Sequence, residues 1–254
     1  MVASLQFHPL PGFLVSSLER STIIMPAANS IGNVGQLTMD LLISSLKDCM
    51  LVGHLESEFV LPVAGLNAFS DGGKGPLTTA LEVFQSTSHP KLTIVQLRSA
   101  LPPSKFQLFA SSLRQWVESI PFQDVIVVSG ADATGRADQQ IARPRITYFA
   151  SFRENFCYDD KLKTLDWSKI DEFTESNSSG TGLVKHLVDE FKMDDSRLSL
   201  LVLLWYTTEG DNLTDSNRMV SGLNELLDLM ICDYKAPPSW KGLFGGQPST
   251  SMFL

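Results

Sequence analysis

Two carboxylates follow the most hydrophobic stretch of this 254-residue chain. Residues 198–205 read LSLLVLLW, which predicts a buried strand, and Glu209 and Asp211 come shortly after it. Carboxylates at a strand end are residue types that general acid–base chemistry uses. No Ser/His or Cys/His pairing can be assigned to accompany them. We therefore expect no catalytic residue here, and we expect both carboxylates to serve the turn before the next helix.

Three further polar groupings could bind a ligand. Lys74 lies in a glycine-rich loop, residues 67–76, where a phosphate or a plain surface loop are the alternatives. His186 and Glu190 lie four residues apart on a predicted helix, a spacing that suits metal ligands, but no third ligand is evident and a solvated pair is favoured. The third grouping follows the β-branched run 124–129, at the strand end where open α/β sheets bind ligands. It comprises Arg136, Asp138, Arg143 and Arg145.

Residues 22–46 carry the strand, turn and helix around which the chain is organised. Thr22–Met25 is a β-branched run closed by Pro26, and the sequence GNVG at 32–35 precedes a helical pattern. Such a turn resembles an anion site at a helix N-terminus. Neither nucleotide-binding glycine fingerprint is present, so a tight structural turn is favoured.

The predicted helix carries two apolar stripes. One stripe contains Val34, Leu37 and Leu41. The other contains Met39, Leu42, Ile43 and Leu46. One stripe can pack on a sheet, and the second must be covered by another layer of the chain or by a partner; the two alternatives are equally open. We take the second stripe as the candidate partner-binding site.

The remaining pattern predicts one α/β domain. Strands are predicted at 50–55, 59–63, 81–84, 92–97, 124–129, 146–149 and 198–205, and helices at 106–120, from 182 and at 213–232. Strand–helix–strand alternation favours a three-layer α/β/α domain with a mixed central sheet. We expect an N-terminal segment at 1–21, a domain at 22–246 and a flexible C-terminal tail at 247–254. Residues 159–180 are predicted to form an acidic surface insert, which Trp167 and Phe173 pin down.

Composition narrows the class of partner. The net charge is −8 and the sequence pI is about 5.0, which disfavours nucleic acid and anionic lipid because both require clustered Lys and Arg. No apolar run reaches the roughly 20 residues of a membrane span, and no signal peptide is evident. Cys49, Cys157 and Cys232 have no C-x-x-C spacing, so we expect reduced thiols and no metal or cofactor. A cytoplasmic and nuclear protein that binds other proteins is expected.

Several motifs resemble one known family. The segment MPAANSIGNVGQL at 25–37 is similar to the N-terminal signature of the proteasome assembly chaperone two family. LTIVQLRS at 92–99, VIVVS at 125–129, EGDN at 209–212 and PSWKGLFG at 238–245 follow in the order of that family. The resemblance spans nearly the whole chain, and the GNVGQL and EGDN motifs carry most of its specificity.

The resemblance implies a function and a fold. It implies a non-enzymatic scaffold with a nucleoside-phosphorylase-like architecture, which pairs with proteasome assembly chaperone one and sits on the α-ring of the forming proteasome core. Met252, Phe253 and Leu254 are similar to a C-terminal docking motif that ends in a hydrophobic residue, Tyr and any residue, although Phe253 stands where Tyr is expected. The alternatives are a homodimeric binding module and a phosphorylase-like enzyme for nucleosides or phosphate esters. The enzyme would bind phosphate at Gly32–Gly35 or Arg98 and a sugar at Glu209 or Asp211.

Overall fold

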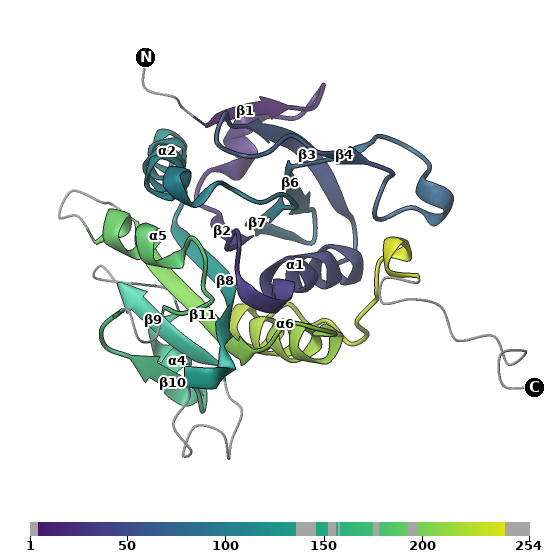
Figure 1. Cartoon of the computed structure of the whole chain (residues 1–254). Helices are drawn as coiled ribbons and strands as arrows, with labels where there is room; N and C mark the ends of the chain where they lie inside the picture. Colours follow the sequence, from purple (N-terminus) through teal and green to yellow (C-terminus); the bar gives the residue numbers. More distant parts are fainter. Residues whose placement is uncertain are drawn as a thin grey trace, which may run out of the picture.

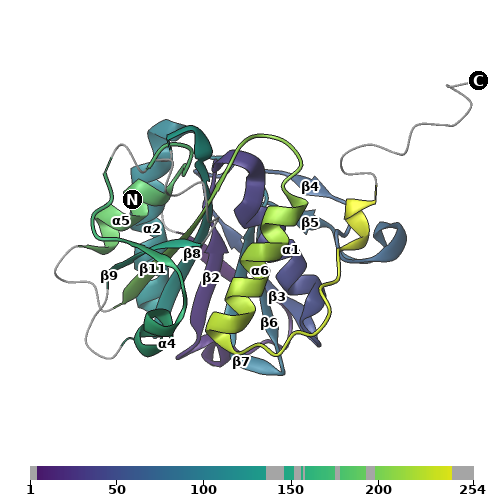
Figure 2. The same ribbon diagram turned by 90° about the horizontal axis from the view of Figure 1, so that it is seen from below.

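A nine-stranded mixed sheet with helices on both faces forms the body of the protein (Figures 1 and 2). The computed structural model describes residues 5–135, 146–151, 156, 158–174, 178–192 and 198–241. The sheet strands are β1 (Gln6–Pro9), β2 (Thr22–Pro26), β3 (Cys49–Glu56), β6 (Leu81–Ser86), β7 (His89–Leu97), β8 (Asp124–Asp132), β9 (Thr147–Ser151), β10 (Ser168–Ile170) and β11 (Ser199–Thr207). The α-helices are α1 (Val34–Ser45), α2 (Phe106–Ser119), α4 (Asp159–Thr164), α5 (Val184–Phe191) and α6 (Leu213–Leu227). The predicted mixed α/β architecture is confirmed.

The sheet has a parallel centre and an antiparallel flank. Its strand order is β1-β3-β6-β7-β2-β8-β11-β9-β10. Strands β7, β2, β8 and β11 run parallel, with Ile24 paired to Ile94 on one side and Ile126 on the other. Strands β1, β3, β6 and β7 form successive antiparallel pairs, and β9 is antiparallel to β11. The parallel strands read as continuous apolar runs because helices cover both of their faces.

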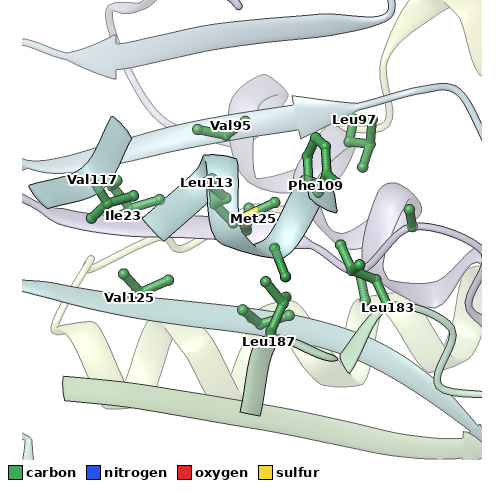
Figure 3. Packing of buried hydrophobic residues seen from close by; sticks show 14 of the residues in the cluster. Ile23, Met25, Val95, Leu97, Phe109, Leu113, Val117, Val125, Leu183 and Leu187 are labelled. Carbon is green, nitrogen blue, oxygen red and sulfur yellow. The ribbon is translucent and has the colours of Figure 1, made fainter. Parts of the chain in front are cut away.

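Helices α2 and α5 cover one face of the sheet. Phe109 and Leu113 of α2 point toward β2 and β7, and Leu187 of α5 belongs to the same buried cluster (Figure 3). Glu190 joins the two helices: its Oε2 accepts hydrogen bonds from Gln107 Nε2 at 2.7 Å and Ser111 Oγ at 2.8 Å. The expectation that His186 and Glu190 form a solvated pair is therefore wrong for Glu190, which is buried between the helices.

Helices α1 and α6 lie side by side on the opposite face (Figures 1 and 2). The four residues of the predicted partner stripe are Met39, Leu42, Ile43 and Leu46, and all four are buried within this chain. They belong to one cluster with Met219 and Leu223 of α6 and with strands of the sheet. The prediction that this stripe is a partner-binding site is wrong, because α6 supplies the second layer that covers it.

Three boundaries differ from the sequence prediction. The described part of the predicted N-terminal segment, residues 5–21, is not separate from the domain, since β1 pairs with β3 at the edge of the sheet. The predicted surface insert at 159–180 contains α4 and supplies β10, which pairs with β9. Phe173 packs against Phe149 with ring centroids 5.8 Å apart, as its predicted pinning role requires. The predicted strand 59–63 is wrong: this region starts a loop excursion from the sheet.

Candidate functional site

The carboxyl ends of β2, β8 and β11 are the first place to examine, because open α/β sheets bind ligands there. The turn after β2 has positive φ at Gly32 (67°) and Asn33 (52°), and α1 begins immediately after it. A Cβ on Gly35 would lie 2.5 Å from the carbonyl oxygen of Val128 on β8. The GNVG sequence therefore lets the start of α1 approach the backbone of the sheet closely.

Asn212 of the EGDN motif fills the space beside this turn. Its Nδ2 donates to the carbonyl of Gly32 at 3.1 Å and to those of Thr208 and Gly210, and its Oδ1 accepts from Thr207 Oγ1. A Cβ on Gly32 would lie 2.5 Å from Asn212 Nδ2. The Asn212 side chain thus joins the turn before α6 to the turn before α1.

The two acidic residues of EGDN differ in their environments. Asp211 Oδ1 accepts a hydrogen bond from the backbone N–H of Leu213 at 3.0 Å, so the expected turn-stabilising role of Asp211 is confirmed. Glu209 is exposed. Asn212 stands at the start of α6, and its side chain makes no capping bond to this helix. Its side chain is instead committed to the turn before α1.

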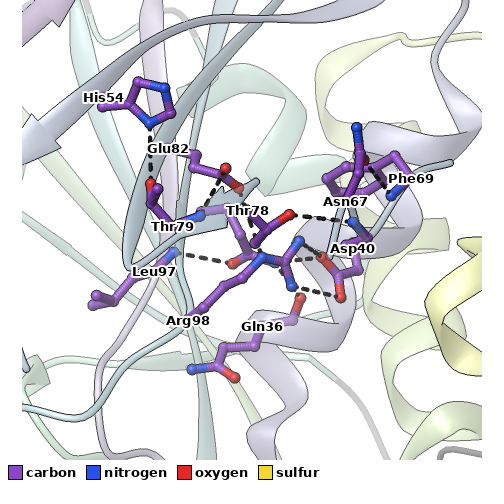
Figure 4. A network of polar contacts seen from close by, with 12 residues as sticks. Gln36, Asp40, His54, Asn67, Phe69, Thr78, Thr79, Glu82, Leu97 and Arg98 are labelled. Atoms are coloured by element: carbon purple, nitrogen blue, oxygen red, sulfur yellow. Dashed lines mark hydrogen bonds and ion pairs between the residues drawn. The ribbon is translucent and has the colours of Figure 1, made fainter. Parts of the chain in front are cut away.

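A buried ion-pair network joins α1 to β7. Asp40 Oδ1 lies 2.6 Å from Arg98 Nη2, and Asp40 Oδ2 lies 3.2 Å from Arg98 Nη1 (Figure 4). Gln96 Nε2 donates to Asp40 Oδ1 at 2.7 Å, and the Arg98 guanidinium lies over the ring of Phe69 at 5.3 Å from its centroid. The bidentate pair commits the Arg98 side chain to Asp40, so it is not a free phosphate ligand.

Titratable groups on β3 and β6 extend this network. His54 Nδ1 lies 3.0 Å from Thr79 Oγ1, and the Thr79 N–H donates to Glu82 Oε1 at 3.0 Å (Figure 4). Burial raises the pKa of Glu82, and the Thr79 hydrogen bond and Arg98 oppose the rise. Burial, followed by the charge of His8, lowers the pKa of His54. Burial also raises the pKa of the Cys49 thiol to about 12, which removes the thiolate that nucleophilic catalysis would need near pH 7.

A loop excursion carries four of the nine exposed large hydrophobic side chains that the described residues contain. Residues 57–80, which we call the excursion, leave the sheet between β3 and β6 and contain the two-residue strands β4 (Ala64–Gly65) and β5 (Thr78–Thr79). Four exposed side chains on it form what we call the apolar patch: Leu61, Val63, Leu66 and Leu77. Leu66 is 72% exposed and Leu77 is 57% exposed, and the two residues directly follow β4 and directly precede β5. Exposed apolar side chains gathered in this way are typical of interaction sites.

The last described residues pack against the excursion. We call Pro238–Lys241 the tail root, because residues 242–254 follow it. The N–H of Ser239 donates to the Ala68 carbonyl at 3.2 Å, and Lys241 Nζ lies 3.0 Å from Asp71 Oδ1. Trp240 Nε1 donates to Asp40 Oδ2 at 3.3 Å. The tail root is thereby fixed to the excursion and to the Asp40 network.

Several residues predicted as ligands or docking groups cannot be placed. Met252, Phe253 and Leu254 lie outside the described residues, and so do Arg136, Asp138, Arg143 and Arg145. Within the described ranges, no group of three or more His, Cys, Asp or Glu residues could hold a metal ion. Nor does any helix there have the length and apolarity needed to span a membrane.

The Asp40 network was missed by the sequence interpretation. Asp40 is the one charged residue of the helix at 34–45, and Arg98 directly follows a buried strand. A carboxylate within an apolar helix must find a cation or a hydrogen-bond donor when it is buried, and this requirement is the signal that could have predicted a pair. The identity of its partner carries no local signal, because the two residues lie on separate elements.

These features define the class of protein: a mixed α/β fold whose own turns fill the carboxyl ends of its parallel strands. Solved structures share this fold. Pyrococcus furiosus PbaA, described as an archaeal homologue of proteasome-assembly chaperone, has a TM-score of 0.64 at 19% identity, covering 94% of this chain and 92% of that one. P. furiosus PbaB, described as an archaeal proteasome activator, has a TM-score of 0.65 at 16% identity, covering 91% of each chain.

The chain belongs to the PAC2 family, whose model matches residues 25–235. Curated relatives carry the name proteasome assembly chaperone 2. The mouse relative is 31% identical over 95% of this chain and 98% of its own length. The human relative is 32% identical over 91% of this chain and 94% of its own length. The resemblance inferred from the motifs is confirmed by these relatives.

Proposed function

We propose that this protein is a proteasome assembly chaperone that acts as a non-enzymatic scaffold. It pairs with proteasome assembly chaperone one, and the heterodimer sits on the α-ring of the forming core particle, in the cytoplasm and nucleus. The observation that carries the proposal is the identity of about 31% to relatives named proteasome assembly chaperone 2, over nearly the full length of both chains. The family model, which matches residues 25–235, spans the GNVGQL and EGDN turns as well as the core.

The enzyme alternative is a phosphorylase-like activity on nucleosides or phosphate esters, and the likeness to nucleoside phosphorylases stays a prediction. Two of its candidate phosphate ligands are already used within the chain, since Asn212 fills the Gly32 turn and Asp40 holds Arg98. A thermal-shift titration discriminates the two functions. Phosphate or a nucleoside at about 100 times a real dissociation constant adds about 2.7 kcal/mol to the free energy of unfolding, and no shift is expected here.

The C-terminal residues Met252, Phe253 and Leu254 are proposed as a docking tail for the α-ring. An apolar pair beside a free terminal carboxylate can be captured in a pocket that binds chain ends. Phe253 lacks the hydroxyl of the Tyr expected in this motif. Deleting these three residues should weaken ring binding while the heterodimer stays intact, and Phe253→Tyr should strengthen it.

The experiment that tests the proposed function is co-expression with proteasome assembly chaperone one and the α-subunits, followed by size-exclusion chromatography and a ring-assembly assay. We expect a one-to-one chaperone heterodimer that co-elutes with α-ring intermediates and increases their yield. A stable homodimer that binds neither proteasome assembly chaperone one nor the α-subunits would support a homodimeric binding module instead. Ring assembly that is equally fast without the chain would contradict the scaffold function.

A further inference from the structure

One segment of the chain crosses the end of α1 without joining the packed core. Residues 232–241, which we call the strap, run from the loop after α6 past α1 to the helical turn Pro238–Trp240 beside the excursion (Figures 1 and 2). Apart from that turn the strap contains no helix or strand, and Pro237 is its one buried residue. Neither apolar cluster of the described core includes a strap residue. Hydrophobic burial therefore contributes little to holding the strap in place.

Hydrogen bonds attach the first half of the strap to the two helices beneath it. The N–H of Lys235 donates to Ser45 Oγ of α1 at 2.8 Å. The hydroxyl of Tyr234 accepts from Asn224 Nδ2 of α6 at 3.3 Å. Both bonds join neutral groups, and each contributes only modestly to the stability of the folded state.

The second half of the strap is attached to the excursion and to the buried ion pair. The N–H of Ser239 donates to the carbonyl of Ala68 at 3.2 Å. Trp240 Nε1 donates to Asp40 Oδ2 at 3.3 Å. Because Asp40 is charged, the second of these bonds is the stronger attachment.

The space beneath the strap is incompletely filled. A cavity of about 430 Å³ is lined by Lys235 and Pro238 of the strap and by Cys49 and Phe84 of the sheet. A second cavity, of about 530 Å³, is lined by Cys232 and again by Lys235. Well-packed protein leaves few spaces larger than a water molecule. The strap is thus bonded towards its two ends and loosely packed between them.

Two prolines couple the two attachments of the strap. Pro237 and Pro238 each have a restricted φ and no N–H, and each restricts the residue before it to an extended conformation. The chain from Lys235 to Ser239 is therefore stiff. A movement that breaks the bond at Ser239 also displaces Lys235.

We propose that the strap is a lid that opens as one unit while the sheet and its helices stay folded. Segments with few buried apolar contacts and with exposed hydrogen bonds open at a lower free-energy cost than the core beneath them. Opening uncovers the cavity wall at Cys49 and releases Trp240 from Asp40, which keeps its bidentate pair with Arg98. This inference does not rest on the proposed chaperone function.

Hydrogen–deuterium exchange of the full-length chain, resolved by NMR, tests whether the strap opens. The amides of Lys235 and Ser239 should be protected equally, and both should exchange at least about a hundredfold faster than the amide of Ile126 at the centre of the sheet. Protection equal to that of Ile126 overturns the inference, because the strap then opens only when the whole chain unfolds. Unequal protection of the two strap amides, or none, also overturns it.

Trp240→Phe tests the coupling between the two attachments. The variant keeps an aromatic ring and removes the N–H that Asp40 accepts. Exchange of the Ser239 and Lys235 amides should become roughly tenfold faster for both, since a hydrogen bond to a charged group is lost. A faster Ser239 amide with an unchanged Lys235 amide overturns the inference. Lys241→Ala is the matched control, because its ion pair is exposed, and it should leave both rates unchanged.

The reactivity of Cys49 with N-ethylmaleimide reports the same opening from the cavity side. Burial raises the pKa of this thiol to about 12, so the closed chain holds almost no thiolate there near pH 7. In Trp240→Phe, the modification rate of Cys49, measured by peptide mass spectrometry, should rise by the same factor of roughly ten. The exposed Cys232 serves as the internal reference and should be unchanged. An unchanged Cys49 rate overturns the inference.

Two further variants separate opening of the strap from loss of the fold. Val117→Ala removes buried atoms from the apolar cluster on the opposite face of the sheet, so it lowers global stability but should leave strap exchange unchanged. Faster strap exchange in Val117→Ala means that the strap opens by global unfolding, which overturns the inference. If Trp240→Phe does not fold, Ser45→Ala removes the acceptor at the other attachment and should accelerate exchange of the Ser239 amide about fivefold.

Discussion

The loops at the carboxyl ends of the parallel strands and the loop of the excursion differ in which side chains they bury. At the strand ends, Asn212 is 4% exposed and its amide group is fully engaged with neighbouring backbone and Thr207. On the excursion, Leu66 and Leu77 are exposed and its strands are only two residues long. One region uses polar groups to hold the fold together, and the other leaves apolar groups available.

This difference separates the motifs that hold the fold together from a loop with exposed apolar side chains. The motifs that look chemical in the sequence, GNVG and EGDN, pair with each other at the strand ends where open α/β sheets bind ligands. The excursion carries no catalytic residue type in a productive arrangement. Variants at the strand ends should therefore change stability, and variants on the excursion should change binding.

The largest effect on stability is expected at Asp40, which connects α1, β7 and the tail root. Asp40→Ala leaves the guanidinium of Arg98 without its bidentate partner in a largely buried setting, a change that costs about 3–5 kcal/mol in comparable buried pairs. We expect a loss of unfolding free energy of about 3 kcal/mol in urea denaturation. Asp71→Ala is the control, since its pair with Lys241 is exposed and contributes nothing measurable. Equal stability of Asp40→Ala and wild type would contradict the network's structural role.

A smaller loss of stability is expected when a methyl group is added between α1 and the sheet. In Gly35→Ala, the new Cβ would lie 2.5 Å from the Val128 carbonyl oxygen, so the helix must shift away from the sheet. Overpacking of this kind costs about 1–3 kcal/mol. Gly65→Ala on the excursion is matched in chemistry but meets nothing within 4 Å, and it should leave the midpoint of thermal unfolding unchanged. The comparison fails if the two substitutions have the same effect.

The third prediction concerns Glu82, whose titration should make the stability of the protein depend on pH. Burial raises its pKa above the unfolded value near 4.5, so the folded chain binds the proton more readily than the unfolded chain. The stability contributed by the protonated group is present below pH 4.5 and is lost as pH rises through the folded pKa. Glu82→Gln cannot titrate, so its unfolding free energy should increase relative to wild type over that interval. Urea unfolding at a series of pH values measures this, with exposed Glu58→Gln as the control; a constant difference would contradict it.

The sequence predicted the elements whose pattern is local. The strand at 22–26 and the long apolar strands β8 and β11 follow from continuous β-branched or aliphatic runs, and α2 follows from apolar residues at helical spacing. Together they predicted a mixed α/β fold, which the structure and its relatives confirm. These features need only the preference of a segment for its own conformation and burial.

The predictions that were wrong or missing concern features that depend on distant parts of the chain. The fate of the Met39 stripe depended on whether α6 would lie beside α1, and no residue in α1 specifies this. Residues 59–63 look like a strand because they form a short apolar run, and Phe59 and Val60 are indeed buried, but the chain leaves the sheet there. Asp40 acquires its partners from β7 and from the tail root, far along the chain. Local periodicity carries no information on such long-range pairing.

The smallest loss of stability is expected for a substitution at the strand ends, at Asp211. In Asp211→Asn, the side chain retains an oxygen that can accept the Leu213 N–H, but it loses the negative charge that favours the N-terminal end of α6. The free energy of unfolding should fall by at most about 1 kcal/mol, as differential scanning calorimetry can measure, and affinity for the partner chaperone and the ring should be unchanged. Asp215→Asn, in the first turn of the same helix, is a useful comparison because its carboxylate accepts from Thr207. A turnover that Asp211→Asn abolishes at unchanged stability would instead make the strand ends a catalytic site, and their purely structural role would be contradicted.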